Sequence, residues 1–261
     1  MNRVLPMIKA ELLKLRKRRG LFWFSLFLSA GSVIVANVFL AAYHAGDPAK
    51  YGPAGGTQGF TSSLNLFALV GALAAVVVGA TAGAQDVGSG VFRSLVSTGQ
   101  SRIRIALVRI PGALLMLLPM LALGFGFELI AAFTLADGTP TPDAGTVLTA
   151  AGWLFAVAVL NVTVALGLAA LLRARGTAIG ILIAWQVAAG RALEHVAALG
   201  SLRALISSVS LDRFLPGAQD TIRLNRVDTV TVTLWAAIAV VVAWIAVATV
   251  LGAWRTATQD A

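Results

Sequence analysis

Residues 83–109 read GAQDVGSGVFRSLVSTGQSRIRIALVR, and this polar stretch separates two long hydrophobic segments. Within it, apolar side chains recur at i, i+1, i+4 and i+5, the spacing that gathers them on one face of a helix. They are Val91, Phe92, Leu95 and Val96. Glycines border the run on both sides, at Gly88, Gly90 and Gly99. The pattern predicts a short amphipathic helix of about ten residues between two glycine hinges.

Positive charge follows this predicted helix. Ser101 is a suitable N-cap for the next helix, and three arginines lead into the apolar run behind it. They are Arg102, Arg104 and Arg109. Because basic residues beside membrane segments mark the cytoplasmic side, we expect the amphipathic helix to face the cytoplasm. There it offers an apolar and basic surface to another protein.

The composition is that of a polytopic membrane protein. Of 261 residues, 58% are hydrophobic and 12% are charged, whereas soluble domains carry about a quarter charged residues. The chain has no cysteine, which excludes disulfides, thiolate metal sites and cysteine nucleophiles. His44 and His195 are distant in sequence and predict no metal site. The net charge of +9 lies mostly beside apolar runs, which favours membrane topology over nucleic-acid binding.

Six apolar segments are long enough to cross a bilayer as helices, which takes about 20 residues. We expect these spans at residues 21–43, 64–84, 105–135, 147–172, 177–199 and 229–254. The first is too long for a signal-peptide core and predicts an uncleaved anchor. The third contains Pro111 and Pro119, each of which removes a helical hydrogen bond, so we expect bends or breaks there.

The N-terminal residues 1–20 combine an apolar helical face with a basic one. Leu5, Ile8, Leu12 and Leu15 share one face, and four basic side chains lie largely outside it. These are the predicted interfacial anchors, Lys9, Lys14, Lys17 and Arg18. The pattern predicts a helix in the cytoplasmic interface, held by anionic headgroups. A simpler function of the basic cluster, fixing the N-terminus inside, is compatible with this one.

Basic residues also determine the expected orientation. Six spans place fourteen of the twenty lysines and arginines on one side, namely Arg3, Lys9, Lys14, Arg16, Lys17, Arg18, Arg19, Arg93, Arg102, Arg104, Arg109, Arg173, Arg175 and Arg255. By the positive-inside rule both termini face the cytoplasm. The abundance of alanine, glycine and arginine suggests a bacterial source, hence the inner (cytoplasmic) membrane.

Small residues in the second span predict close helix packing. Gly79 and Gly83 form a GxxxG pair, and Ala75 extends the same face. Such a face lets another helix approach closely. The partner is either another helix of this chain or the same helix of a second copy.

Four ionisable residues fall in or near the predicted spans. Glu128 lies at the outer boundary of the third span, where it is either hydrated or in contact with a substrate or cation. Arg191, Glu194 and His195 lie within about one turn of the fifth span, where an isolated charge is costly. They form a local ion pair, a polar wall of a translocation path, or, for His195, a catalytic base.

Residues 200–228 are amphipathic but too short to span. Leu202, Leu205, Ile206 and Val209 share one helical face, and the turn at 214–217 ends it. This segment also mixes arginines and aspartates on the predicted outer side, which departs from the positive-inside rule. They are Arg203, Arg213, Arg223, Arg226, Asp212, Asp220 and Asp228. A mixed-charge surface loop is the simplest interpretation.

The chain resembles the type-two permeases of ATP-binding cassette transporters. The resemblance is carried by an acidic residue, glycines, a small-apolar-basic helix and a Ser-Arg pair, namely Asp86, Gly90, Val91, Phe92, Arg93, Leu95, Ser101 and Arg102. The N-terminal basic helix and the spacing of the apolar runs also fit. The family implies that residues 1–20 form a connecting helix. It further implies an outer re-entrant or interfacial segment before the last span.

In this family the first cytoplasmic loop carries a coupling helix that docks on a separate ATPase. The resemblance therefore implies that Asp86, Val91, Phe92, Arg93, Leu95 and Arg102 couple the chain to two copies of a nucleotide-binding subunit. ATP and Mg²⁺ would be bound by that partner and no cofactor by this chain. A second copy of the chain, or a sister permease, would complete the pathway.

Enzyme motifs are missing from the sequence. It contains no GxxxxGK[ST] phosphate loop and no GxSxG or HExxH motif, and no histidine or acid is placed to activate Ser89. We therefore expect a single permease domain over residues 1–261, all-α with six spans. It would export an amphipathic antibiotic, drug or lipid-like compound, because the predicted path is mostly apolar. A glycan or cation cargo, a membrane immunity or sensor subunit, and an intramembrane enzyme using Glu128, Glu194 or His195 are the alternatives.

Overall fold

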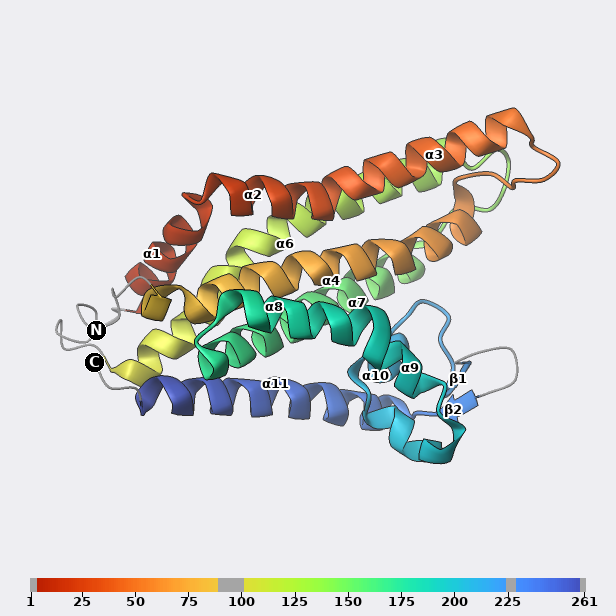
Figure 1. Cartoon of the computed structure of the whole chain (residues 1–261). Helices are drawn as coiled ribbons and strands as arrows, with labels where there is room; N and C mark the ends of the chain where they lie inside the picture. The colour runs from red at the N-terminus through yellow and green to blue at the C-terminus, as the bar shows by residue number, and fades with distance from the viewer. Residues whose placement is uncertain (1–3, 89–100, 224–228, 259–261) are drawn as a thin grey trace.

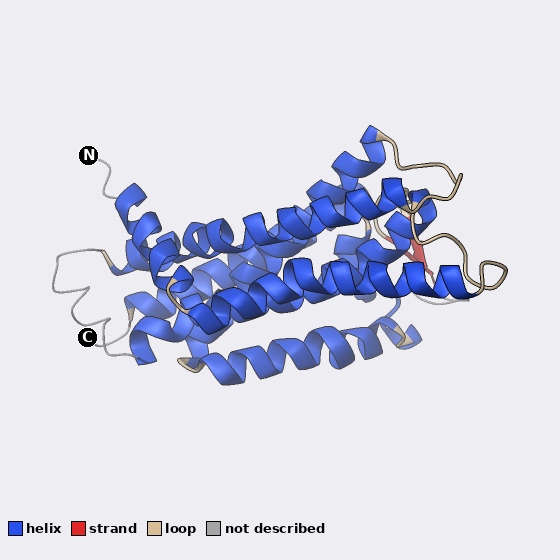
Figure 2. Cartoon of the chain, turned by 90° about the horizontal axis from the view of Figure 1, so that it is seen from above, coloured by secondary structure: helices blue, strands red, loops and turns tan. Residues whose placement is uncertain are grey.

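The computed structural model describes residues 4–88, 101–223 and 229–258, which form a bundle of long helices (Figure 1). Among these residues, six helical stretches are long and apolar enough to cross a membrane. They are Arg19–Gly46, Gly56–Gln85, Arg102–Thr134, Ala144–Leu172, Arg175–Glu194 and Leu234–Ala257. The expectation of an all-α, multi-pass membrane protein is confirmed. Figure 2 shows from above that strand structure is confined to a small hairpin at one end.

The described residues of the first half of the chain supply six helical elements. They are α1 (Val4–Arg16), α2 (Arg19–Leu26), the π-helical turn η1 (Phe27–Gly31), α3 (Ser32–Gly46), α4 (Gly56–Gly88) and α6 (Arg102–Thr134). The second half adds α7 (Ala144–Leu172), α8 (Arg175–Ala184), the π-helical turn η2 (Trp185–Ala189), α9 (Gly190–Glu194), the 3-10 helix η3 (Ala197–Leu205), α10 (Ser207–Asp212), β1 (Thr221–Arg223), β2 (Thr229–Thr231) and α11 (Leu234–Ala257).

One end of the bundle collects α1, the start of α6, the turn between α7 and α8, and the end of α11 (Figure 1). Arg102 Nη1 donates to the carbonyl oxygen of Ala257 at 3.2 Å, which ties the first residue of α6 to the last of α11. The opposite end carries η3, α10 and the hairpin. We call the first of these the basic end, because twelve lysines and arginines of the described residues belong to it: Lys9, Lys14, Arg16, Lys17, Arg18, Arg19, Arg102, Arg104, Arg109, Arg173, Arg175 and Arg255.

The centre of the bundle is the contact between α4 and α7. A Cβ atom built on Gly79 would lie 3.0 Å from Val162 Cα, and one on Gly83 would lie 3.1 Å from the Leu166 carbonyl carbon. Ala75 on the same face is fully buried. The prediction of close packing is therefore confirmed. The alternative, a seam between two copies through this face, is wrong because α7 already covers it.

The N-terminal helix packs on the third span. Leu15 is fully buried, and a Cβ atom on Gly112 of α6 would lie 2.7 Å from Glu11 Cβ. Lys14 Nζ donates to Glu11 Oε1 at 2.7 Å. Of the other predicted anchors, Lys9, Lys17 and Arg18 are exposed. A helix is thus present from residue 4 to 16, while its location in the membrane interface stays a prediction.

The third span differs from the expectation at the prolines. Pro111 and Pro119 both lie inside α6, which continues through them as one helix. Of the bends or breaks expected there, a break is wrong, because a proline removes only one backbone hydrogen bond and α6 packs against α1, α4 and α7. A bend stays a prediction. The helix also begins at Arg102, three residues before the predicted start.

The segment before the last span does not form one amphipathic helix. Gly200 adopts a left-handed φ of +49°, and Ile206 is extended, so η3 and α10 are separate short helices. Leu202 and Leu205 are exposed, whereas Ile206 and Val209 are buried. The predicted shared face of these four residues is therefore wrong.

The last two spans are shorter than predicted, because short local elements occupy the residues between them. Residues 229–231 pair with residues 221–223 as an antiparallel hairpin, so the last span begins at Leu234 instead of 229. The fifth ends at Glu194 instead of 199, because residues 197–199 belong to η3.

Candidate functional site

A cavity of about 220 Å³ lies between α4, α7, the fifth span, α10 and α11. Its middle is apolar. Small residues of α4, Ala68 and Ala72, line it together with Val157, Leu160 and Val164 of α7. Both helices can contribute to one wall because the glycine contacts hold them close together. The cavity is therefore suited to an apolar body.

Three amide side chains interrupt the apolar wall: Asn65 of α4, and a hydrogen-bonded pair formed by Asn161 of α7 and Gln186 of η2. Gln186 Nε2 donates to Asn161 Oδ1 at 2.5 Å, and Asn161 Nδ2 donates to the Val157 carbonyl at 2.9 Å. Polar side chains inside a span are costly unless they pair or serve a function. Sequence reasoning missed this pair, although an Asn and a Gln in the middle of two apolar runs were the available signal.

A π-helical turn orients the fifth span toward the cavity. The amide of Gly190 donates to the carbonyl of Trp185, five residues earlier, and both Trp185 and Gln186 line the cavity. Such single turns are frequent at functional sites. A side chain at Gly190 would bring its Cβ atom within 2.8 Å of the Trp185 oxygen. Glycine at this position thus permits the turn.

A charged cluster lies at the end of the cavity that is opposite the basic end. Arg191 Nη1 pairs with Glu194 Oε2 at 3.0 Å, and the Ser208 hydroxyl donates to Glu194 Oε1 at 2.6 Å. Arg203 Nη1 donates to the backbone carbonyl of Glu194 at 3.3 Å. The predicted local ion pair is confirmed. Arg191 lines the cavity, while Glu194 is buried behind it.

Asp212, the last residue of α10, also lines the cavity. Burial raises the pKa of its carboxyl to about 6; the nearby Arg191 lowers the pKa and Glu194 raises it. The backbone carbonyl of Asp212 accepts from the Leu215 amide at 3.2 Å, but among the described residues its carboxylate receives no hydrogen bond. Sequence reasoning placed this residue in a surface loop, since nothing local indicates that α10 turns back over the cavity.

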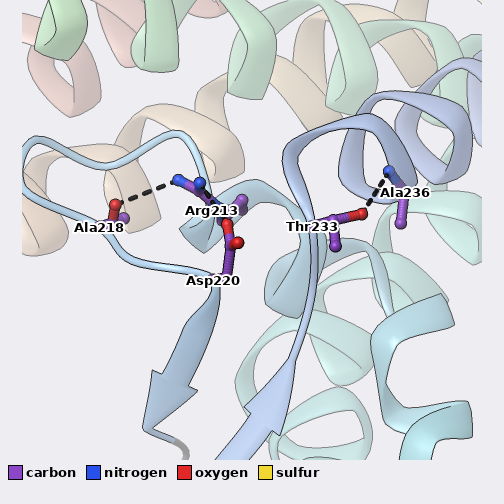
Figure 3. A network of polar contacts seen from close by, with 5 residues as sticks. All are labelled: Arg213, Ala218, Asp220, Thr233 and Ala236. Atoms are coloured by element: carbon purple, nitrogen blue, oxygen red, sulfur yellow. Dashed lines mark hydrogen bonds and ion pairs between the residues drawn. The ribbon is translucent and has the colours of Figure 1, made fainter.

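The loop after α10 is fixed by a second ion pair (Figure 3). Arg213 Nη2 pairs with Asp220 Oδ1 at 2.6 Å, and Arg213 Nη1 donates to the Ala218 carbonyl at 3.1 Å. Thr233 then caps α11 by accepting from the amide of Ala236 at 3.3 Å. These contacts hold the chain on both sides of the hairpin, and so position the end of α10.

His195 is exposed, and it is not among the residues that line the cavity. Glu128 belongs to another place in the bundle. It is 2% exposed between α3, α4 and α6, where its Oε2 accepts from Asn37 Nδ2 at 2.9 Å and its Oε1 accepts from the Ser63 hydroxyl. The three residues proposed for an intramembrane enzyme, Glu128, Glu194 and His195, therefore do not converge.

The expectation of a hydrated Glu128 at the outer boundary is wrong. The helix continues six residues beyond it to Thr134, about 9 Å at 1.5 Å per residue. The side chain points between neighbouring helices that supply two donors. Its observed contacts are those of a residue that ties three spans together.

Replacing Glu128 by leucine should lower the thermal stability of the protein. The change leaves the buried amide of Asn37 and hydroxyl of Ser63 without this partner, at a cost of about 1–3 kcal/mol. Glu128→Gln keeps one acceptor and one donor and should stay close to wild type. Melting temperatures in one detergent measure both, and equal values for the Leu variant and wild type would contradict the assignment.

The predicted coupling residues divide into two groups. Val91, Phe92, Arg93 and Leu95 lie outside the described residues. Asp86 is in the last turn of α4, and Arg102 opens α6 at the basic end.

Fold and cavity define the class: a multi-pass helical membrane protein with a mixed apolar and charged cavity. No protein-family model matches the chain, and a search of curated proteins finds no match either.

Proposed function

We propose that the chain is the membrane-spanning permease subunit of an ATP-binding cassette exporter of amphipathic compounds, such as antibiotics, drugs or lipid-like molecules. One observation carries the proposal. The α4 helix ends and α6 begins at the basic end of the bundle, so the segment joining them leaves from the side that the positive-inside rule assigns to the cytoplasm. That segment carries the residues that resemble a coupling helix.

The distribution of charge supports an orientation with both termini in the cytoplasm of a bacterial cell. The basic end holds twelve lysines and arginines, which are named above. The other end holds fewer, and Arg191 and Arg213 there are paired with acids. The net positive charge of the basic end suits anionic headgroups on the inner leaflet.

Exposed apolar helices favour a second subunit. Of the most apolar 18 residues of each span, 72% are buried in the second span, but only 17% in the fifth and 11% in α11. A second copy, or a sister permease, would cover part of this surface, and lipid the rest. The pathway would then alternate between inward- and outward-facing packings of the helices.

In this proposal the partner ATPase, present in two copies, holds ATP and Mg²⁺. Its closure on ATP moves residues 91–97, and this motion passes to the spans on either side, α4 and α6. The chain itself performs no chemical step. The apolar cavity and its charged end hold the compound while the helices rearrange.

Affinity purification from the native membrane tests the proposal. The chain should co-elute with a protein that contains a GxxxxGK[ST] phosphate loop, and the complex should hydrolyse MgATP. If no phosphate-loop protein co-elutes from nanodiscs or from several mild detergents, the chain is not the permease of such a transporter. The chain would then be better described as an immunity or sensor subunit, which binds a ligand but does not transport it.

A further inference from the structure

We infer that the cavity binds an amphipathic organic cation, with the cationic group at Asp212 and the apolar body among Trp153, Trp185 and Trp244. The interpretation of this cation as a transported substrate rests on the proposed function. The binding itself requires no ATPase, so the two can fail independently.

Of the two acidic side chains at this end of the cavity, Asp212 is the one that lines it. Arg191 is paired with Glu194, and Glu194 receives a further hydrogen bond from Ser208. The carboxylate of Asp212 receives no hydrogen bond among the described residues, and the residue lines the cavity. A partly buried carboxylate without a hydrogen bond favours a cation beside it.

Three tryptophans from three elements supply the surface for the rest of the molecule. Trp153 comes from α7, Trp185 from η2 and Trp244 from α11. Indole rings are the aromatic groups that bind organic cations best. Trp244 Nε1 donates to the Leu205 carbonyl at 3.0 Å, which fixes that ring next to η3 and α10.

Trp153 carries an unsatisfied donor. The residue is 3% exposed, and its Nε1 is buried without a hydrogen-bond partner in the described structure. Buried donors without partners are rare in native proteins. Trp153 therefore brings to the cavity lining an indole whose donor no group of the described structure satisfies.

Two kinds of molecule carry the required cationic group: a free amine-containing compound and a lipid with an amine headgroup. Both present an organic cation joined to an apolar body. The experiment below separates them by the composition of the membrane. Either source is consistent with a cation at Asp212.

The test uses the full chain in phosphatidylglycerol nanodiscs, with radiolabelled benzyltrimethylammonium as the probe and neopentylbenzene as its neutral isostere. The wild type should bind the cation, and the isostere should compete weakly. Asp212→Asn should lower the affinity about tenfold or more, because a charge-assisted contact is lost. Asp212→Glu should retain most of it. Added phosphatidylethanolamine that displaces the probe from wild type identifies the lipid amine as the natural ligand.

A pH titration of the wild type tests the same contact without a substitution. Burial holds the pKa of Asp212 near 6, so the affinity should fall as the pH drops from about 7.5 through 6 and the carboxyl takes up a proton. The charged groups that surround it are Arg191 and Glu194 of α9 and Arg203 of η3, while α7 contributes none and α11 only Arg255 at the basic end. His195→Gln is the matched control and should leave this profile unchanged.

Two results would overturn the inference. One is equal affinity of Asp212→Asn and wild type for the cation. The other is equal binding of the cation and its neutral isostere. If Asp212→Asn does not fold, an affinity of the wild type for the cation that is constant between pH 5 and 7.5 would also overturn the inference. None of these results depends on ATP, so they leave the permease proposal to its own test.

Discussion

Stimulation of ATP hydrolysis should be abolished when Arg93→Glu and Leu95→Asp are introduced together. The predicted helix presents an apolar and basic face, and the double change reverses its charge and places a carboxylate where an apolar contact is expected. A desolvated carboxylate opposite an apolar groove costs several kcal/mol, enough to separate the two subunits. Insertion in the membrane should be unaffected, because the substitutions lie outside the six spans.

The matched control makes the same kind of change at the other end of the bundle. Leu202 is 61% exposed on η3 and Lys50 is exposed in the loop after α3, so Leu202→Asp with Lys50→Glu alters equivalent chemistry away from the basic end. The control should retain stimulation. The ATPase rate of the complex in nanodiscs decides between them, and full stimulation of the Arg93/Leu95 variant would remove this helix from the coupling.

The second large effect is expected at the glycine contact between α4 and α7. Gly79→Leu would force a side chain against Val162 and Ala165, whose Cα and Cβ atoms would lie 3.0 and 3.1 Å from the new Cβ atom. Overpacking of this kind costs about 1–3 kcal/mol, and more where backbone atoms oppose the new group. The melting temperature should fall by roughly 5–10 °C.

Gly126→Leu is the control for this prediction. Gly126 lies in α6 with no atom within 4 Å of its Cβ position. The same residue type, also inside a span, is therefore changed without a clash. Its melting temperature should stay near that of the wild type. Equal losses in both variants would mean that leucine, and not the α4 contact, causes the effect.

The number of spans was predictable because it depends on the length of apolar runs, a local property. Their ends were less so. The second span begins at Gly56 instead of 64. The hydroxyls of Thr61 and Ser63 donate hydrogen bonds to backbone carbonyls four residues earlier, so these polar residues fit inside a helix. Hydropathy alone assigns such residues to a loop.

The cavity was not predictable from the sequence, because its lining comes from separate elements between residues 65 and 244. Arg191 and Glu194 were recognisable because charges in a span are unusual. Asp212 was not, since its position depends on the left-handed Gly200 and the extended Ile206 that turn α10 back over the bundle. Glu128 was recognised as unusual, but its burial depends on Asn37, 91 residues away.

The central claim is that residues 89–100 meet a nucleotide-driven partner. The native chain contains no cysteine, so a single cysteine reports one position without background. In the purified complex, treated with a short thiol-to-amine crosslinker, Leu95→Cys should crosslink to the phosphate-loop protein, whereas Leu202→Cys at the opposite end should not. A crosslink from position 202 together with none from position 95 would contradict the account.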